Sequence, residues 1–330
     1  MISIRALLPK YHDILEQQGV AQYLDCKHIP VSFTLIQSTD ELWCIHDEAL
    51  QLMRVQVSTP IQSLLDLKIE LADRLFQACC FCEHRCRVNR KKTAGKCGVQ
   101  ELRIASEFLH FGEETVLVPS YTIFFSGCTF HCVFCQNWDI SQNPCGVAIE
   151  PKTLVSVIEQ RKKQGARNVN WVGGDPTSDI LYILKVLQKL DSNISQVWNS
   201  NMYCSEEAMK LLHGVIDLYL TAFKYGNDSC AKRLSKVDGY TAVVERNHML
   251  AHQQGEVIVR HLVLPNHGTC CSQRIMQWIQ KNIPEVSVNI MAQYRPEYHA
   301  DEYKEIACAV SREEYLRVKE YAETLGLFLI

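Results

Sequence analysis

Sixteen cysteines stand in this chain of 330 residues, and seven of them fall into two tight groups. The first group has Cys-x2-Cys-x3-Cys spacing with one further cysteine behind it, and the second has Cys-x3-Cys-x2-Cys spacing. Thiols clustered in this way in a reducing compartment are typical of metal binding or redox chemistry rather than of disulfides. The two groups are Cys79, Cys82, Cys86 and Cys97, then Cys128, Cys132 and Cys135.

The second cysteine group follows directly on a β-rich run that ends at Gly127. In a parallel α/β sheet, this puts three thiolates at the C-terminal end of a strand, which is the edge where active sites collect. Three thiolates suit a [4Fe–4S] cluster, because one iron then stays open for a substrate or cofactor. A structural zinc ion is the alternative, and it would need a fourth ligand such as His131 or Cys145.

The first cysteine group supplies four thiolates, which is enough to close a metal site. Tetrahedral zinc and an auxiliary iron–sulfur cluster both take four thiolates, so the count does not choose between them. Cys80 can replace Cys79 in the count, but Cys79 keeps the two-residue gap to Cys82. A reduced structural loop without metal is the alternative.

Candidate ligand-binding residues follow the later strands of the expected sheet. Gly173 and Gly174 would let the backbone approach a ligand closely, and Asp175 beside them could pair with an ammonium group. Taken alone, Gly-Gly-Asp-Pro is a turn. Asn199 belongs to a polar strand end suited to ribose or carboxylate contacts. His261 lies in another strand, where a hydrogen-bonded core histidine is the alternative.

The other nine cysteines show no ligand spacing. Isolated cysteines usually fill a core as small hydrophobic residues. Cys145 and the adjacent Cys270 and Cys271 could lie near a site, but spacing alone does not show it.

Regular alternation of β-rich and helical segments begins at residue 120. Six strand-then-helix units imply parallel strands joined by right-handed crossovers. Residues 120–330 are too few for the roughly 250 residues of an eight-unit barrel, so we expect an open, partial (β/α)6 barrel of the TIM type. A doubly wound sheet is the rival, because both folds bury their strands on two faces. We predict strands at 122–126, 168–172, 196–200, 217–223, 257–264 and 286–292, and helices at 151–164, 178–190, 205–213, 239–253, 272–282 and 311–325.

Three segments divide the chain. Residues 1–77 are predicted to form a helical extension without a motif for chemistry, residues 78–119 a cysteine-rich metal-binding element, and residues 120–330 the core domain. The basic run between Arg85 and Lys96 is most simply a solvated loop. A docking surface for an acidic protein or a phosphate is the alternative.

The composition excludes several classes of protein. Apolar residues make up 47% and charged residues 22%, which supports a large core and argues against disorder. A net charge of −3 gives no case for a nucleic-acid partner. No apolar stretch approaches the roughly 18 residues of a membrane span, and the first residues lack the pattern of a secretion signal. We therefore expect a cytoplasmic protein without a membrane or nucleic-acid partner.

The run from Gly127 to Cys135 resembles the signature loop of the radical S-adenosylmethionine (SAM) superfamily, with Phe134 at the aromatic position before the third cysteine. The resemblance implies a [4Fe–4S] cluster on Cys128, Cys132 and Cys135 whose open iron binds SAM. It implies reductive cleavage of SAM to a 5′-deoxyadenosyl radical, which abstracts hydrogen from a substrate.

The resemblance also implies SAM-binding roles for residues outside the loop. Gly173, Gly174 and Asp175 resemble a Gly-Gly-Glu-Pro element that contacts the methionyl end of SAM, with Asp in place of Glu. Phe134 and His261 are implied to lie near the adenosine, and Asn199 belongs to the same set of implied SAM contacts.

A closer resemblance is to the branch of the pyruvate formate-lyase activating enzymes. It rests on residues 79–98, 108–114 and 289–296, whereas Ala222 and Ala292 stand where that branch usually carries Asp. The branch implies a glycyl-radical protein as target, with another protein or a small molecule as the alternative substrate, and an electron donor such as flavodoxin or ferredoxin. The rival from another class is a non-catalytic metal-binding protein, zinc or iron–sulfur, with a structural or interaction role.

Overall fold

The computed structural model describes residues 4–51, 60–143 and 145–330, so residues 1–3, part of the start inspected for a secretion signal, lie outside the described chain. One eight-stranded sheet runs through it, and the strands lie side by side in the order of the sequence. The strands are β1 Ile104–His110, β2 Ser120–Phe125, β3 Asn168–Gly173, β4 Ser195–Ser200, β5 Leu218–Ala222, β6 Glu256–Leu262, β7 Ser287–Met291 and β8 Phe328–Leu329.

The strand order decides between the two predicted architectures. Strands β2 to β8 are parallel to their neighbours, and β1 is antiparallel to β2. A doubly wound sheet reverses its strand order at a switch point, whereas this order never reverses. Among the described strands, β1 and β8 each pair on one side only. The expected open, partial barrel is therefore confirmed, and β8 adds a short seventh parallel strand.

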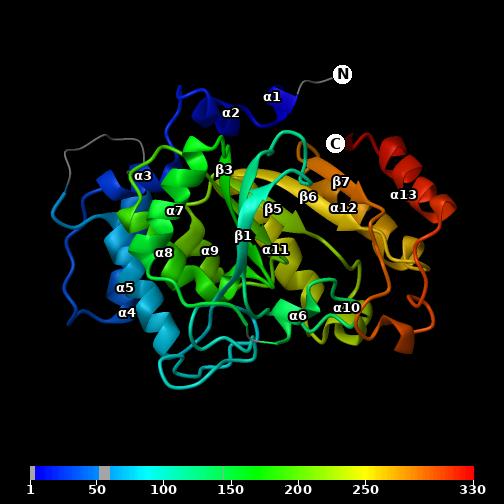
Figure 1. The fold of residues 1–330 in the computed structure, drawn as a ribbon, viewed down its shortest axis with the longest axis horizontal. Coiled ribbons are helices and arrows are strands. Elements are labelled where there is room, and N and C mark those ends of the chain that lie inside the picture. Colours follow the sequence, from blue (N-terminus) through cyan, green and yellow to red (C-terminus); the bar gives the residue numbers. More distant parts are fainter. Residues whose placement is uncertain (1–3, 52–59, 144) are drawn as a thin grey trace.

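Helices alternate with the parallel strands and cover the outside of the sheet (Figure 1). Pro151 opens one of them, and Ser205 and Ser311 cap two others. The strands β1 and β8 and the polar helix α10 were not among the predicted elements. The helices are α6 Trp138–Ser141, α7 Pro151–Lys163, α8 Ile180–Lys189, α9 Glu206–Leu212, α10 Asp228–Ser235, α11 Tyr240–Gln254, α12 Gln273–Asn282 and α13 Arg312–Thr324, with 3-10 turns η1 Pro176–Asp179 and η3 Ala300–Glu302 and a π-helical turn η2 Gly268–Ser272.

The N-terminal helices pack onto the barrel rather than apart from it. Helix α5 lies against α8, and Tyr11 of α2 enters a buried cluster with Val197, Leu218 and Ile258 of the sheet. In Figure 1, α1 and α2 lie at the opposite end of the barrel from the cysteine-rich segment. The division into three segments stays a prediction. These helices are α1 Ile4–Leu7, α2 Pro9–Leu15, α3 Gln22–His28, α4 Thr39–Leu50 and α5 Leu64–Gln77.

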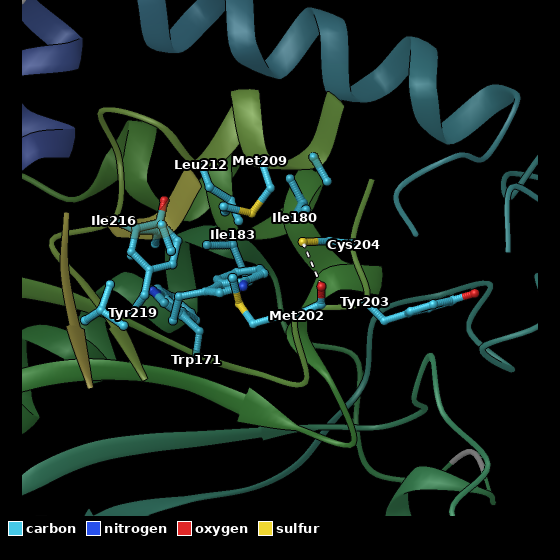
Figure 2. Packing of buried hydrophobic residues seen from close by; sticks show 14 of the residues in the cluster. Trp171, Ile180, Ile183, Met202, Tyr203, Cys204, Met209, Leu212, Ile216 and Tyr219 are labelled. Carbon is cyan, nitrogen blue, oxygen red and sulfur yellow. Dashed lines mark hydrogen bonds between the residues drawn. The ribbon is translucent and has the colours of Figure 1, made fainter. Parts of the chain in front are cut away.

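The main core lies between the sheet and its covering helices. Trp171 of β3 and Tyr219 of β5 are fully buried against Ile183 of α8 and Leu212 of α9 (Figure 2). None of the described helices is long and apolar enough to cross a membrane.

One buried cation in the N-terminal helices makes stability depend on pH. The ammonium of Lys68 in α5 lies 2.7 Å from Nε2 of His46 and donates to the carbonyl oxygen of Lys210 at 2.9 Å. Burial lowers the pKa of Lys68 to about 8, whereas an unfolded lysine titrates near 10.4. Between these two values the unfolded chain holds a proton that the folded chain has released, so stability rises with pH across this window.

We therefore expect the Lys68→Met variant to lack this rise. Urea midpoints measured from pH 7.5 to 10.5 should increase more for the wild type than for the variant. Lys152→Met, at an exposed position, is the matched control and should follow the wild type. Parallel profiles for the wild type and Lys68→Met would contradict the prediction.

Candidate functional site

The three cysteines of the second group lie in the loop after β2, at the C-terminal edge of the parallel sheet. Cys128 and Cys132 are buried and Cys135 is half-buried. The cysteine-rich segment, α6 and α10 gather at this same end, at the bottom of Figure 1. The fold thus brings the predicted cluster ligands to the edge where the sequence predicts them.

The spacing of these sulfurs tests which metal they fit. Three thiolates on one tetrahedral zinc ion, with Zn–S bonds of about 2.3 Å, lie about 3.8 Å apart. Among the described residues, the Sγ atoms of Cys128, Cys132 and Cys135 do not all lie within 4.8 Å of one another. Thiolates that bind different irons of one cluster are farther apart than thiolates on a single ion. The donor set therefore fits a cluster better than a zinc ion.

Two of the thiols are held by hydroxyl groups from other elements. Sγ of Cys132 lies 2.9 Å from Oγ of Ser235 at the end of α10, and Tyr225 hydrogen-bonds the same hydroxyl at 2.6 Å. Sγ of Cys135 lies 3.2 Å from Oγ of Ser141 in α6. Burial, together with the charge of Cys135, raises the pKa of Cys132 to about 12. Ser235 and Tyr225 carry no signal in the sequence, because they lie far from the loop along the chain.

The two glycines after β3 are required by the cysteine loop itself. A Cβ at Gly174 would lie 2.0 Å from the carbonyl oxygen of Gly127, and one at Gly173, whose φ is +115°, would lie 2.3 Å from the backbone nitrogen of Phe125. The Cys128 thiol also donates to the carbonyl oxygen of Gly174 at 3.2 Å. The sequence predicts that these glycines face a ligand, whereas the contacts that require them here are with β2 and the loop.

Asp175, like the two glycines, makes contacts within the protein's own fold. Its buried carboxylate accepts from the backbone N–H of Thr177 at 3.0 Å, from the Ser200 hydroxyl at 3.0 Å and from the backbone N–H of Asn201 at 2.9 Å. Burial raises the pKa of this carboxyl. Because three of its roughly four acceptor positions are filled from the chain, Asp175 ties β3 to the end of β4, which leaves little capacity for an ammonium partner.

Three other predicted SAM contacts have different surroundings. Both ring nitrogens of His261 are occupied, by the carbonyl of Phe223 and the hydroxyl of Ser272, each at 2.8 Å, so the core-histidine alternative describes it. Burial and the charge of Lys224 lower the pKa of His261 to about 4. Phe134 is buried edge-to-face against Tyr294. Asn199 lies half-buried on the face of β4 that also carries the buried Val197.

Lys224 is a cation near the cysteine loop that the sequence motifs do not single out. It follows β5, is half-buried, and its charge acts on the pKa of both Cys132 and His261. Within the described chain its ammonium has no recorded ion pair. Ala222 and Ala292, where the related branch usually carries Asp, offer no carboxylate to it. In the sequence, the hint of this unpaired cation is that alanine stands at positions 222 and 292 in place of the two aspartates.

The four-cysteine group also converges. The charge of each of Cys79, Cys86 and Cys97 acts on the pKa of Cys82, which burial raises, and Cys86 acts on Cys79. A Cβ at Gly95 would lie 3.1 Å from Sγ of Cys86 and 3.7 Å from Sγ of Cys97. Cys80 is buried as well, and the charge of Cys79 acts on its pKa, so it lies beside the group.

The basic run beside this group is not simply a solvated loop, so that prediction is wrong for part of it. Arg90 is only 1% exposed and donates to the carbonyl oxygens of Val99 and Ser178. Its charge lies beside Cys79 and Cys97, where it opposes the rise in thiol pKa that burial causes. No carboxylate forms an ion pair with Arg90 among the described residues, but its charge also acts on the pKa of the buried carboxyl of Asp179, so Asp179 and the thiol group are both places where a balancing negative charge can form.

The cysteine-rich element, residues 78–119, is hydrogen-bonded directly to the loop that carries Cys128, Cys132 and Cys135. Cys128 donates its backbone N–H to the carbonyl oxygen of Cys97 at 3.2 Å. A ring nitrogen of His84 lies 2.8 Å from the carbonyl oxygen of Thr129, and Cys82 forms a β-bridge with Cys204. The two predicted metal-binding groups therefore form one continuous structure at this end of the sheet.

A family model described as the radical SAM superfamily matches residues 122–279. An uncharacterized protein of Methanocaldococcus jannaschii is 46% identical to the chain over 337 residues, covering 98% of this chain and 99% of that protein. The chain belongs to the radical SAM superfamily. Membership implies an enzyme that uses a [4Fe–4S] cluster and SAM.

Solved structures with a similar arrangement include methylornithine synthase, at 13% identity and a TM-score of 0.46 over 97% of this chain and 77% of that one. SuiB of Streptococcus suis bound to S-adenosylmethionine is 15% identical, with a TM-score of 0.45 over 62% of this chain, and the match spans less than half, 47%, of that protein. QueE from Escherichia coli is 14% identical, with a TM-score of 0.41 over 72% of this chain and 98% of that one.

A cavity of about 720 Å³ opens at the side of the radical SAM barrel, between β7, β8 and the loop before β2. Its polar wall is Arg260, which forms a bidentate ion pair with Glu114 at 2.6 and 2.7 Å and a second pair with Glu113. Asn289 donates to Glu114 at 2.8 Å. Because Met291 and the C-terminal strand supply apolar lining, the cavity combines a charged wall with an apolar one.

Proposed function

We propose that Cys128, Cys132 and Cys135 hold the [4Fe–4S] cluster at which this radical SAM enzyme cleaves SAM, and that a hydrogen atom is then taken from a substrate. The observation that carries the proposal is the placement of these three thiols in the loop after β2, at the C-terminal edge of the parallel sheet, close enough for Cys132 and Cys135 to act on the pKa of Cys128. When bound, the cluster supplies the electron that cleaves the sulfonium of SAM to a 5′-deoxyadenosyl radical.

The residues around the loop orient SAM and exclude water in this proposal. Phe134 and Tyr294 form an apolar wall beside the loop, which supports a dry site. The ammonium of Lys224, without an ion pair in the described chain, is the group available to the carboxylate of SAM. Asn199 offers an amide to the ribose. Asp175 holds the turn after β3 instead of binding the SAM ammonium.

We propose that the substrate binds in the lateral cavity, whose lining includes Gln293, and the carbonyl oxygen of Gln293 accepts from the side-chain amide of Gln136, next to Cys135. The cavity volume of about 720 Å³ lies in the range of small-molecule sites, which is roughly 300 to 1,000 Å³. Two carboxylates face one guanidinium there, so the wall carries excess negative charge and favours a substrate group with positive charge or N–H donors. Activation of a glycyl-radical protein, with membership in the activating-enzyme branch, is supported by the sequence resemblance alone.

The four-cysteine group is proposed as a second metal site. Within the described chain, no three of these four sulfurs all lie within 4.8 Å of one another, so an iron–sulfur cluster fits them better than zinc, as it does for the cysteine loop. Four thiolates on either metal carry net negative charge, which would help to balance the buried guanidinium of Arg90. An iron–sulfur cluster there would also offer an entry point for an electron from a flavodoxin or ferredoxin. Iron and zinc analysis of the purified protein separates the two metals.

Assaying 5′-deoxyadenosine tests the proposed chemistry. Protein reconstituted anaerobically with iron and sulfide should form it from SAM and dithionite. Cys132→Ala should keep the far-ultraviolet circular dichroism of the wild type and lose the product, because one cluster ligand is missing. Cys44→Ser, at an exposed isolated cysteine, is the control and should form product.

Two outcomes would contradict the proposal. Full product formation by Cys132→Ala would exclude the loop as the cluster site. A wild type that shows the visible absorption of a cluster but makes no product would favour the non-catalytic metal-binding alternative.

A further inference from the structure

A third group of cysteines meets in the fold without any signal in the sequence. Cys230 lies in α10, and Cys270 and Cys271 lie in the π-helical turn η2, some forty residues later. The three Sγ atoms all lie within 4.8 Å of one another. Within the described chain, this is the only group of three Cys, His, Asp or Glu side chains whose ligand atoms come so close.

Asn227 forms hydrogen bonds with both α10 and η2. The amide of Asn227 accepts from the backbone N–H of Cys230 at 2.9 Å and donates to the carbonyl oxygen of Cys270 at 2.9 Å. Gly226 makes the approach possible, because a Cβ there would lie 2.7 Å from the carbonyl oxygen of Cys271. The π-helical turn brings two consecutive cysteines to the same place, and such turns are frequent at functional sites.

Burial raises the pKa of the Cys270 and Cys271 thiols, and hydrogen bonds around the sulfurs oppose this rise. Cys230 stands in the first turn of α10, an eight-residue helix whose N-terminus favours negative charge. Nδ2 of Asn227 lies 3.7 Å from Sγ of Cys271, and the backbone N–H of Gly226 also hydrogen-bonds this sulfur. Metal-bound thiolates commonly accept such N–H bonds, which orient the ligand.

We propose that Cys230, Cys270 and Cys271 form a metal site that binds one Zn²⁺ through three thiolates, with the fourth position open to water. All-sulfur donors select thiophilic ions over Mg²⁺ or Ca²⁺. The separations below 4.8 Å agree with the roughly 3.8 Å between thiolates on one zinc ion. Cys230 and Cys270 are half-buried, so an ion and a water can reach them. Three S–H protons are released as three Zn–S bonds form.

A zinc ion at this position would also stabilise helix α10. Helix α10 begins at this thiol group and ends at Ser235, whose hydroxyl contacts Cys132 and whose carbonyl accepts the backbone N–H of His131. Zn²⁺ would fix the helix that supports the cluster loop. The site does not depend on SAM cleavage, so it can be tested separately from the proposed function.

Zinc binding to the holoprotein tests the site. Protein with its iron–sulfur content already reconstituted, so that the other cysteine groups are occupied, is titrated anaerobically with Zn²⁺ against a chromophoric chelator. The wild type should bind one equivalent more than Cys230→Ser or Cys270→Ser and should release protons that these variants do not. Cys44→Ser is the matched control and should behave as the wild type.

Cobalt gives an independent readout of the ligands. Co²⁺ added in place of Zn²⁺ should produce sulfur-to-cobalt charge-transfer absorption in the wild type and Cys44→Ser, and this absorption should be lost in Cys230→Ser. Equal zinc content in the wild type and both serine variants would overturn the proposal. So would a disulfide among the three cysteines in protein kept anaerobic throughout.

Discussion

Replacing Gly174 by alanine should remove the cluster absorption and lower 5′-deoxyadenosine formation by about a hundredfold or more. The added Cβ would lie 2.0 Å from the carbonyl oxygen of Gly127 and 3.0 Å from Cβ of Cys128. No side-chain rotation relieves this contact, because the opposing atoms belong to the backbone and to a Cβ. The loop that carries the thiols must move away from β3, and a ligand displaced by about 1 Å no longer fits the cluster.

The control for this variant is Gly268→Ala, where no atom lies within 4 Å of the added Cβ and φ is not positive. It should keep the iron content and the product yield of the wild type. Iron, sulfide and visible absorption are measured on all three proteins after identical reconstitution. A Gly174→Ala protein with full iron content and normal product would show that the loop tolerates the shift, and that the close approach to Gly127 is not what positions the cysteines.

The six core strands and most of their helices were predictable, because buried β-branched runs alternate with helical periodicity from residue 120 onward. The order of these strands within the sheet was not predictable. Barrel and doubly wound sheets bury strands on two faces alike, so only the pairing of each strand with its sequence neighbour decided between them. Strand β1 lies at the edge and is half-exposed, and α10 is polar, which is why neither stood out.

The cysteine loop was predictable because its ligands are close in sequence. The groups around it were not, because Ser235 at the end of α10, Lys224 after β5 and Asn201 after β4 lie far from it along the chain, and only the fold brings them together. The same reason hid the three-thiol group, whose members are ordinary isolated cysteines in the sequence. The role of Gly173, Gly174 and Asp175 in binding SAM stays a prediction, and the fold adds close contacts and hydrogen bonds of these residues with the protein's own backbone.

The charged wall of the cavity shows the same dependence on distant residues. Register puts Ala222, Arg260 and Asn289 side by side across three strands, and the carboxylates that meet Arg260 come instead from Glu113 and Glu114, before β2. Burial alone would raise the pKa of Glu114, but the hydrogen bonds and charge of Arg260 lower it below its ordinary value. The three groups therefore form one buried unit in which the cation keeps the Glu114 carboxylate ionised.

Arg260→Met should lower the free energy of unfolding by about 3 to 5 kcal/mol at pH 7, because two buried carboxylates lose their cation. Arg5→Met, which removes an exposed ion pair with Glu16, is the control and should cost at most about 1 kcal/mol. Urea midpoints of the anaerobic proteins measure both.

The pH dependence and a compensating variant separate charge from lost packing in Arg260→Met. A carboxyl whose folded pKa is depressed stabilises the fold above its unfolded pKa and loses that contribution as pH falls. The wild-type advantage over Arg260→Met should therefore shrink from pH 7 toward pH 4, as the orphaned carboxyls of the variant take up protons. Adding Glu113→Gln and Glu114→Gln to Arg260→Met should recover most of the loss, because no buried charge is then left unpaired. A deficit that is constant with pH and unchanged by the glutamines would mean that Arg260 acts through its volume and not through its charge.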